Sequence, residues 1–154
     1  MLQKILFFTL LFTFSHADED TLKVVYDVTT SQQKVFEKNI FKGIVAHKIY
    51  YTSQFKELEV AVVIHGGAYK FFLKDLHNTE YIKDKKLLNS YKNFKKRVQS
   101  LADSYNVVFY ICKIGLKRHN IKESNVLNFV HIIPNSTIGL IDKQNDGYAY
   151  IPVN

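Results

Sequence analysis

LEVAVVIHGG, residues 58–67, decides the fold class of this chain. Six of its first seven residues are apolar, three of them are valines, and two glycines end the run. A short, continuous apolar run rich in β-branched residues is typical of a strand that is buried on both faces of a sheet. The stretch NVVFYIC (106–112) repeats the pattern. The two runs together predict a sheet covered by helices on both sides.

Segments with strand and helix patterns alternate along the rest of the chain. Strands are expected at residues 22–28, 58–64, 106–112, 131–134 and 148–152, and helical segments at 31–51, 69–76, 87–105, 113–120, 123–130 and 135–147. Apolar residues recur every three or four positions in two of these helices: Phe36, Ile40, Ile44, His47 (a boundary member) and Tyr51 in the first, and Leu87, Tyr91, Phe94, Val98, Leu101 and Tyr105 in the third. Such alternation predicts an α/β sandwich with a mainly parallel sheet of about five strands.

The first 20 residues, MLQKILFFTLLFTFSHADED, predict a secretory signal. Lys4 precedes the apolar run 5–14, and Ser15-His16-Ala17 fits the small-x-small pattern of a signal peptidase site. The run is shorter than the roughly 20 residues that span a bilayer. We therefore expect a signal peptide at 1–17 and one domain at 18–154 in an exported, periplasmic protein without stable membrane insertion after cleavage. An uncleaved membrane anchor is the alternative.

The chain is basic, with a formal net charge of +7, and removal of Lys4 leaves +6. Much of the excess lies in KDKK (83–86) and KNFKKR (92–97). A basic surface permits nucleic acid or anionic partners. Export argues against nucleic acid, and the simplest interpretation of the lysines is a solvated helix face.

A candidate site follows from the predicted sheet. Ligands of open parallel sheets bind beyond the carboxyl ends of the strands. The residues of interest at these ends are Thr29 after the first strand, His65, Gly66 and Gly67 after the second, Cys112 at the end of the third, and Asn135 after the fourth. These strand ends are expected to form one cleft that suits a small anionic ligand.

Cys112 is the only cysteine, so no disulfide can form within the chain. It stands where a strand hands over to a helix, and Lys113, Lys117, Arg118 and His119 follow it. Backbone N–H groups at a helix start and nearby positive charge favour the thiolate, which is the nucleophilic form of cysteine. The alternative is a small apolar residue that packs in the core.

His65 and the two glycines also allow more than one interpretation. His65 could be a general base, an anion-binding donor or a partner of the thiolate, or its ring could simply bond a loop carbonyl. Gly66 and Gly67 could admit a ligand to the backbone or make a tight turn. The sequence carries no phosphate-loop, zinc-ligand or nucleophile-elbow pattern, so no metal and no cofactor are expected.

Four segments resemble the DsrE/DsrF-like family of small α/β proteins. They are KVVYDVT (23–29), EVAVVIHGGAYKFFL (59–73), VVFYICKIGLKRHNI (107–121) and IIPNSTIGLIDKQNDGYAYIPV (132–153). The resemblance implies a three-layer α/β/α domain that often forms a homotrimer or homohexamer. In the sulfur-relay members the cysteine that matches Cys112 accepts sulfur as a persulfide and passes it on.

Two functions follow as hypotheses. In the first, Cys112 carries sulfane sulfur between a donor and an acceptor thiol, and Lys113, Arg118 and His65 stabilise the anion without a cofactor. In the second, the protein is a non-enzymatic module for small-ligand binding or assembly, and Cys112 only packs. A buried sulfur far from His65 favours the second, and an accessible sulfur near basic groups favours the first.

Overall fold

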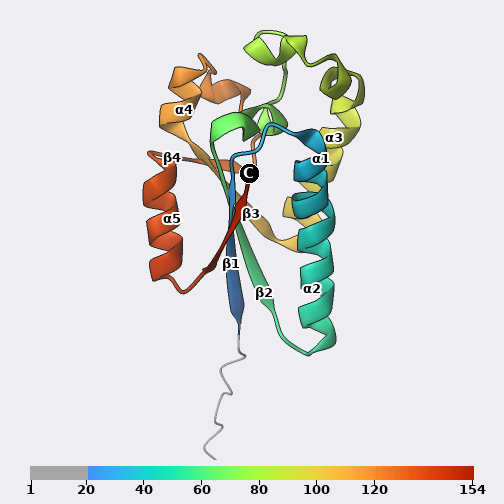
Figure 1. Ribbon diagram of the computed structural model, residues 1–154, viewed down its shortest axis with the longest axis vertical. Helices are drawn as coiled ribbons and strands as arrows, with labels where there is room; N and C mark the ends of the chain where they lie inside the picture. Colours follow the sequence, from blue (N-terminus) through green and yellow to red (C-terminus); the bar gives the residue numbers. More distant parts are fainter. Residues whose placement is uncertain (1–20) are drawn as a thin grey trace, which may run out of the picture.

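The computed structural model describes residues 21–154, so the predicted signal peptide lies outside the described residues. Five parallel strands form one sheet in the order β4-β3-β2-β1-β5 (Figure 1). The strands are β1 Leu22–Val28, β2 Leu58–Ile64, β3 Val107–Cys112, β4 Val130–Ile133 and β5 Ala149–Val153. The predicted α/β class is confirmed, and the sheet, expected to be mainly parallel, is parallel at every strand pair.

Helices cover both faces of the sheet. One face carries α1 (Gln33–Phe36), the π-helical η1 (Glu37–Gly43), α2 (Ile44–Ser53) and α3 (Lys85–Tyr105), while α5 (Ser136–Asn145) lies on the other (Figure 1). The short α4 (Lys113–Arg118) and the 3-10 helices η2 (Gly66–Phe72), η3 (Glu80–Lys83) and η4 (Glu123–Asn125) gather near the carboxyl ends of the strands. Among residues 21–154, no helix has both the length and the apolar character needed to cross a bilayer.

The main core lies between the sheet and the α1–α3 layer. The predicted stripe of α3 is confirmed from Leu87 to Leu101, since its members are buried there. The stripe predicted for 31–51 holds at Phe36, Ile40 and Ile44, but His47 is exposed. Phe41 is buried as well, because the wide turns of η1 shift the apolar face relative to a regular α-helix.

Two helical expectations near the top of the sheet are corrected. The segment 69–76 is helical only as far as Phe72, in 3-10 form, and 123–130 forms only the three-residue η4. The two segments bond to each other instead: Lys74 N donates to Asn125 O at 2.7 Å, and Leu127 N donates to Phe72 O at 3.0 Å. These bonds between segments take the backbone groups that a longer helix would have used.

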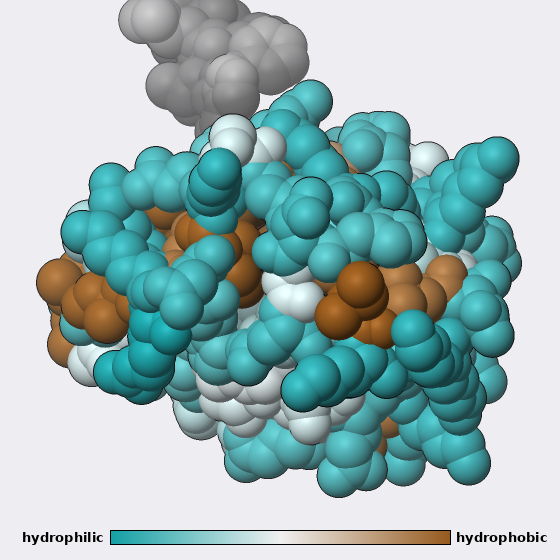
Figure 2. All heavy atoms as spheres, turned by 90° about the horizontal axis from the view of Figure 1, so that it is seen from above, coloured by the Kyte–Doolittle hydropathy of each residue, from teal (hydrophilic) through white to brown (hydrophobic). Residues whose placement is uncertain are grey.

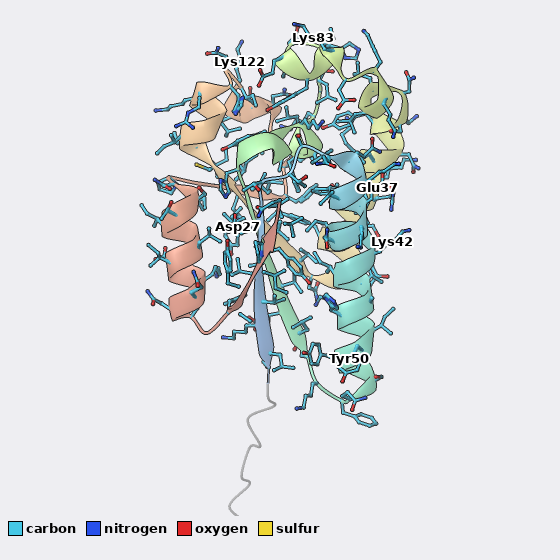
Figure 3. All side chains as sticks on the ribbon, viewed as in Figure 1. Asp27, Glu37, Lys42, Tyr50, Lys83 and Lys122 are labelled. Atoms are coloured by element: carbon cyan, nitrogen blue, oxygen red, sulfur yellow. The ribbon has the colours of Figure 1, made fainter. Side chains whose placement is uncertain are left out.

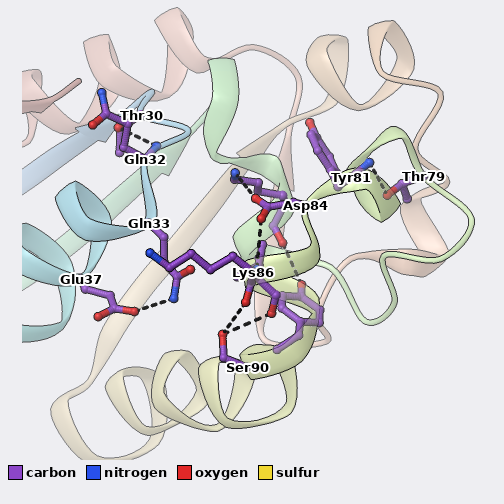
Figure 4. A network of polar contacts seen from close by, with 12 residues as sticks. Thr30, Gln32, Gln33, Glu37, Thr79, Tyr81, Asp84, Lys86 and Ser90 are labelled. Carbon is purple, nitrogen blue, oxygen red and sulfur yellow. Dashed lines mark hydrogen bonds and ion pairs between the residues drawn. The ribbon is translucent and has the colours of Figure 1, made fainter.

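Local caps hold the loop between η2 and α3. The Asp84 carboxylate accepts from Leu87 N at 3.1 Å at the start of α3 and from Lys70 Nζ at 2.7 Å (Figure 4). The Thr79 hydroxyl accepts from Tyr81 N at 3.2 Å and begins η3. Side-chain oxygens of this kind satisfy the free N–H groups of a first turn. They fix η2 and η3 over the end of β3, where Cys112 lies.

Candidate functional site

The carboxyl ends of the strands meet at one edge of the sheet, as the sequence predicted. Figure 2 looks onto this end of the molecule, where apolar side chains surface among mostly hydrophilic ones. Cys112 ends β3 and stands at the cap position of α4, and its residue is 5 % exposed. The cysteine is therefore a buried residue at the predicted edge.

Groups from three segments lower the pKa of the Cys112 thiol. Burial alone would raise the pKa of the Cys112 thiol, but hydrogen bonds from the N–H groups of Gly115 and Ser136 and from the Tyr69 and Ser136 hydroxyls outweigh burial and lower it. Ser136 is the first residue of α5, so donors from two helix starts converge on one atom. Donors directed at a sulfur favour its anionic form.

Tyr69 supplies the buried hydroxyl of this group. It stands in η2, is 1 % exposed, and its Oη donates to the carbonyl oxygen of Cys112 at 3.1 Å. Burial and the hydrogen bond with Cys112 raise the pKa of Tyr69, so the phenol remains protonated and able to donate. Its one proton serves either the Cys112 carbonyl or the Cys112 sulfur, and a negative charge on the sulfur favours the second.

Gly115 makes room for that hydroxyl. A Cβ atom at position 115 would lie 1.7 Å from Tyr69 Oη and 2.3 Å from its Cζ. Only glycine therefore lets the tyrosine reach the Cys112 backbone while α4 keeps its place.

The basic residues near Cys112 have other partners. Lys113 Nζ pairs with Glu123 Oε1 at 2.8 Å, and His119 Nδ1 bonds Glu80 Oε1 at 2.5 Å. The positive charge of Arg118 opposes the rise in the pKa of Tyr69, which burial and the hydrogen bond with Cys112 cause. Backbone and hydroxyl dipoles, rather than the lysine and arginine charges expected from the sequence, are thus the main groups that lower the pKa of Cys112.

A second polar cluster joins three strands. His65, directly after β2, bonds through Nε2 to Asp27 Oδ1 at 2.6 Å, and Tyr150 Oη of β5 donates to Asp27 Oδ2 at 2.7 Å. Asp27 belongs to β1, and Figure 3 places it at the sheet in the middle of the molecule, well away from Lys83 and Lys122 at the top. The carboxylate is thus held at both oxygens in a strand that is otherwise apolar from Val24 to Val28.

The other predicted site residues make local structural contacts. Thr29 Oγ1 donates to Asn154 Oδ1 at 2.7 Å, and the Asn135 side chain caps α5 by accepting from Thr137 N at 2.8 Å. Gly66 has a φ of +58°, and Gly67 N donates to Thr29 O at 2.8 Å. Here the two glycines make a tight turn packed on the end of β1. No group of three or more His, Cys, Asp or Glu side chains in 21–154 is arranged to hold a metal ion.

The candidate functional residues Tyr69, Gly115, Ser136, Asp27 and Tyr150 were not among the predicted site residues. Asp27 left a signal, because it is the one acid in the apolar strand LKVVYDV. Gly115 left a weaker one, as a glycine within a predicted helix, three residues after the cysteine. Tyr69 lies far from Cys112 in sequence, and no local pattern points to it, whereas Ser136 directly follows Asn135 at the predicted end of the fourth strand.

The sequence model of the DsrE/DsrF-like family matches residues 23–153. The chain belongs to the DsrE/DsrF-like family. Another similar chain is an uncharacterized protein of Aquifex aeolicus (strain VF5), 30 % identical over 97 residues. That match takes in 63 % of this DsrE-like chain and 41 % of the relative, so the chain spans less than half the length of the relative.

A solved structure has the same fold as this DsrE-like protein. It is a protein of unknown function from Methanobacterium thermoautotrophicum, with a TM-score of 0.55 and 16 % sequence identity. The similarity covers 85 % of this chain and 98 % of the other. At this identity it concerns the arrangement of strands and helices alone.

The donors around the sulfur lead to a prediction for Tyr69→Phe and Ser136→Ala. Each change removes a hydroxyl that favours the thiolate, so each is expected to raise the pKa of Cys112. A hydrogen bond to a charged group contributes about 1.5 kcal/mol, so the thiolate fraction below the pKa should fall about tenfold. The thiolate is measured by its ultraviolet absorbance against pH. Tyr50→Phe, at an exposed tyrosine on α2, is the control, and equal curves for all variants would contradict the prediction.

Proposed function

We propose that this DsrE-like protein is a sulfur carrier that holds sulfane sulfur as a persulfide on Cys112. The observation that carries the proposal is the place of Cys112 at the carboxyl end of β3 and the start of α4, where interactions with Gly115, Ser136 and Tyr69 lower the pKa of its thiol. Such preorganised dipoles stabilise an anionic sulfur without a cation beside it. Membership of the DsrE/DsrF-like family adds support.

Loading requires no cofactor and no net oxidation. The Cys112 thiolate attacks the outer sulfur of a donor persulfide, R–S–SH, and the S–S bond of the donor breaks. The donor leaves as the thiolate RS⁻, and Cys112 becomes Cys–S–SH. The four donors hold the attacking thiolate before the step, and they hold it again when the sulfur is passed on to an acceptor thiol.

The low exposure of Cys112 is compatible with this chemistry. The outer sulfur of a persulfide lies about 2 Å beyond Sγ. The atom that is transferred therefore need not be as deeply buried as the thiol sulfur, whose residue is 5 % exposed. A small donor that reaches the rim of the site suffices for loading.

The test is an intact-mass spectrum of the protein before and after treatment with a polysulfide, beside Cys112→Ser. A gain of one sulfur atom that a thiol reverses and that Cys112→Ser lacks is the expected result. A Cys112→Ser protein that still gains sulfur would contradict the proposal. Equal unfolding curves of the two proteins exclude a folding defect of the variant.

A second candidate is a non-enzymatic module that binds a small anion or assembles with other chains, in which Cys112 only packs. The observation in its favour is the burial of Cys112 against Leu116 and the rest of the main core. The same spectrum separates the two functions. A thiol that stays unmodified in the native protein and reacts only after denaturation would favour this module.

We also propose export and self-assembly. The pattern at Ser15-His16-Ala17 supports cleavage after Ala17 and a periplasmic location.

Ile138 and Ile141, one turn apart on α5 and each half exposed, support a homo-oligomer, since exposed apolar stripes mark contact surfaces. The mass of the exported protein reports the cleavage, and light scattering reports the oligomer. A monomer at high concentration would exclude assembly.

A further inference from the structure

The Asp27–His65–Tyr150 cluster lies on the same side of the sheet as the Cys112 sulfur. Val25 of β1 and Val63 of β2 pack beneath α5. Side chains alternate along a strand, so Asp27 and His65, each two positions further on, point to the α5 side as well. Tyr110 of β3 packs against the same cluster, so Cys112, two positions further on, is directed to the α5 side at the end of its strand, although it also belongs to the buried cluster of the main core.

The strand register makes His65 and Cys112 neighbours. Ile64 of β2 pairs with Ile111 of β3, so the next residues on the two strands are His65 and Cys112. Adjacent strands lie about 4.8 Å apart. Within residues 21–154 no hydrogen bond joins the two side chains. The two residues thus stand on adjacent strands at the same edge of the sheet, while Nε2 of the His65 ring is bonded to Asp27 on the other neighbouring strand, β1.

The hydrogen bond with Asp27 indicates which ring nitrogen of His65 is the donor. Because the Asp27 carboxylate accepts at Oδ1, the ring nitrogen Nε2 must carry a proton. The hydrogen bond to Asp27 also raises the pKa of Tyr150, which keeps that hydroxyl as a donor to Oδ2. Nδ1 has no hydrogen-bond partner in the part of the chain that the structure describes, and the side chain is 28 % exposed. A neutral His65 therefore offers Nδ1 as a free base at the edge of the sheet.

We propose that His65, oriented by Asp27 and Tyr150, is the general base that deprotonates the acceptor of sulfur, and that the acceptor is a protonated alkyl thiol. The inference rests on the proposed persulfide at Cys112. A base in this place matters only for an acceptor that arrives as a thiol, because a thiolate is already the nucleophile. His65 touches the reacting thiol, while Asp27 and Tyr150 are positioning residues.

The step balances without an added oxidant or reductant. The acceptor R–SH gives its proton to Nδ1 of His65, and its sulfur attacks the outer sulfur of Cys112–S–SH. The S–S bond of the persulfide breaks, the acceptor leaves as R–S–SH, and Cys112 becomes a thiolate held by its four donors. His65 then returns its proton to water.

The experiment compares two acceptors with persulfide-loaded protein, for which loading has been shown by intact mass. N-acetylcysteine is an alkyl thiol that is mostly protonated at neutral pH, and 4-nitrothiophenol is an aromatic thiol that is ionised there. His65→Gln is expected to slow transfer to N-acetylcysteine about a hundredfold, the usual contribution of a general base, and to change transfer to 4-nitrothiophenol less than about threefold. His131→Gln, an exposed histidine of β4, is the control and should change neither rate.

Three further measurements test whether the role of His65 is chemical or structural and which acceptors reach it. Added imidazole should restore part of the N-acetylcysteine rate to His65→Ala, which a collapsed site would not permit. A single-cysteine peptide is tested as the acceptor in place of N-acetylcysteine. Only an acceptor whose thiol reaches Nδ1 of His65 should react more slowly with His65→Gln than with the wild-type protein. A slower rate with the peptide would therefore show that a protein thiol can reach the base. Tyr150→Phe should slow N-acetylcysteine transfer and spare the aromatic thiol, as expected of a residue that orients the base.

The outcomes keep the two proposals apart. Wild-type protein that never gains sulfur overturns the carrier function, and the role of His65 falls with it. Wild-type protein that loads sulfur, with His65→Gln slowing both acceptors equally or neither, overturns only the role of His65. A selective loss with the alkyl thiol, relieved by imidazole, supports both.

Discussion

Gly115→Ala should lower the free energy of unfolding by about 2–3 kcal/mol, although alanine normally stabilises a helix by up to about 1 kcal/mol over glycine. The clash decides the sign. The new Cβ would lie 1.7, 2.3 and 2.7 Å from the Oη, Cζ and Cε2 atoms of Tyr69, a side chain that is almost fully buried and cannot turn aside. At this chain length the midpoint of thermal unfolding should fall by about 10 °C. Calorimetry or denaturant titration measures the loss.

Two further variants test whether the clash with Tyr69 causes the loss. In Gly43→Ala, in η1, the nearest atom to the new Cβ outside the adjacent helical backbone is Lys38 O at 3.4 Å, so this change should be neutral or slightly stabilising. Tyr69→Leu removes all three clashing atoms, so Gly115→Ala should cost far less in that background. Additive losses in this cycle would show that the tyrosine is not the obstacle. The displaced hydroxyl should also raise the pKa of Cys112 in Gly115→Ala, because one donor to the sulfur is lost.

Phe36→Ala is expected to cost about 4 kcal/mol of unfolding free energy. Phe36 is fully buried, and its ring centroid lies 5.3, 4.5, 5.6 and 5.4 Å from those of Phe41, Phe71, Phe72 and Phe94. Its removal leaves a cavity in the contact between η1, η2 and α3 that rigid rings cannot fill. Denaturant titration gives the change directly.

The matched control for Phe36 is Phe55→Ala. Phe55 is 94 % exposed, so its replacement should change the free energy of unfolding by less than about 0.5 kcal/mol. A loss at Phe36 as small as that at Phe55 would mean that the cluster rearranges to fill the space. η2 carries Tyr69, so loss of Phe36 should also weaken the thiolate at Cys112.

The sheet could be predicted from the sequence because buried parallel strands are continuously apolar. The short, β-branched runs LEVAVVI and VVFYIC fit few structures other than such strands. The long stripe of α3 was predictable because its spacing and its lysines agree on one exposed face. The π-helical η1 was not, because a π-turn uses the same residue types as an α-turn and shifts only the buried face. The early end of the helix predicted at 69–76 could not be predicted, because this segment bonds to Asn125 and Leu127, about 50 residues further along the chain.

The place of the candidate site could be predicted, but its chemistry could not. The rule for strand ends brought His65 and Cys112 to one edge of the sheet. The lysines beside Cys112 suggested a charged site, but Lys113 pairs with an acid from another segment. The groups that lower the pKa of Cys112 include the Tyr69 hydroxyl, from 43 residues before the cysteine, and Ser136 at the start of α5. Tyr150 reaches Asp27 across 123 residues.

The strand order also means that the sheet cannot be completed until β5 has been synthesised. β1 lies between β2 and β5, so the first strand pairs with the last, from Val24 with Ala149 to Val28 with Val153. Pairs so distant in sequence raise the contact order and slow folding. Until β5 is available, β1 keeps one row of unpaired peptide groups, which is a template for aggregation. A chaperone that shields this edge of β1 would therefore be of most use before β5 has been synthesised.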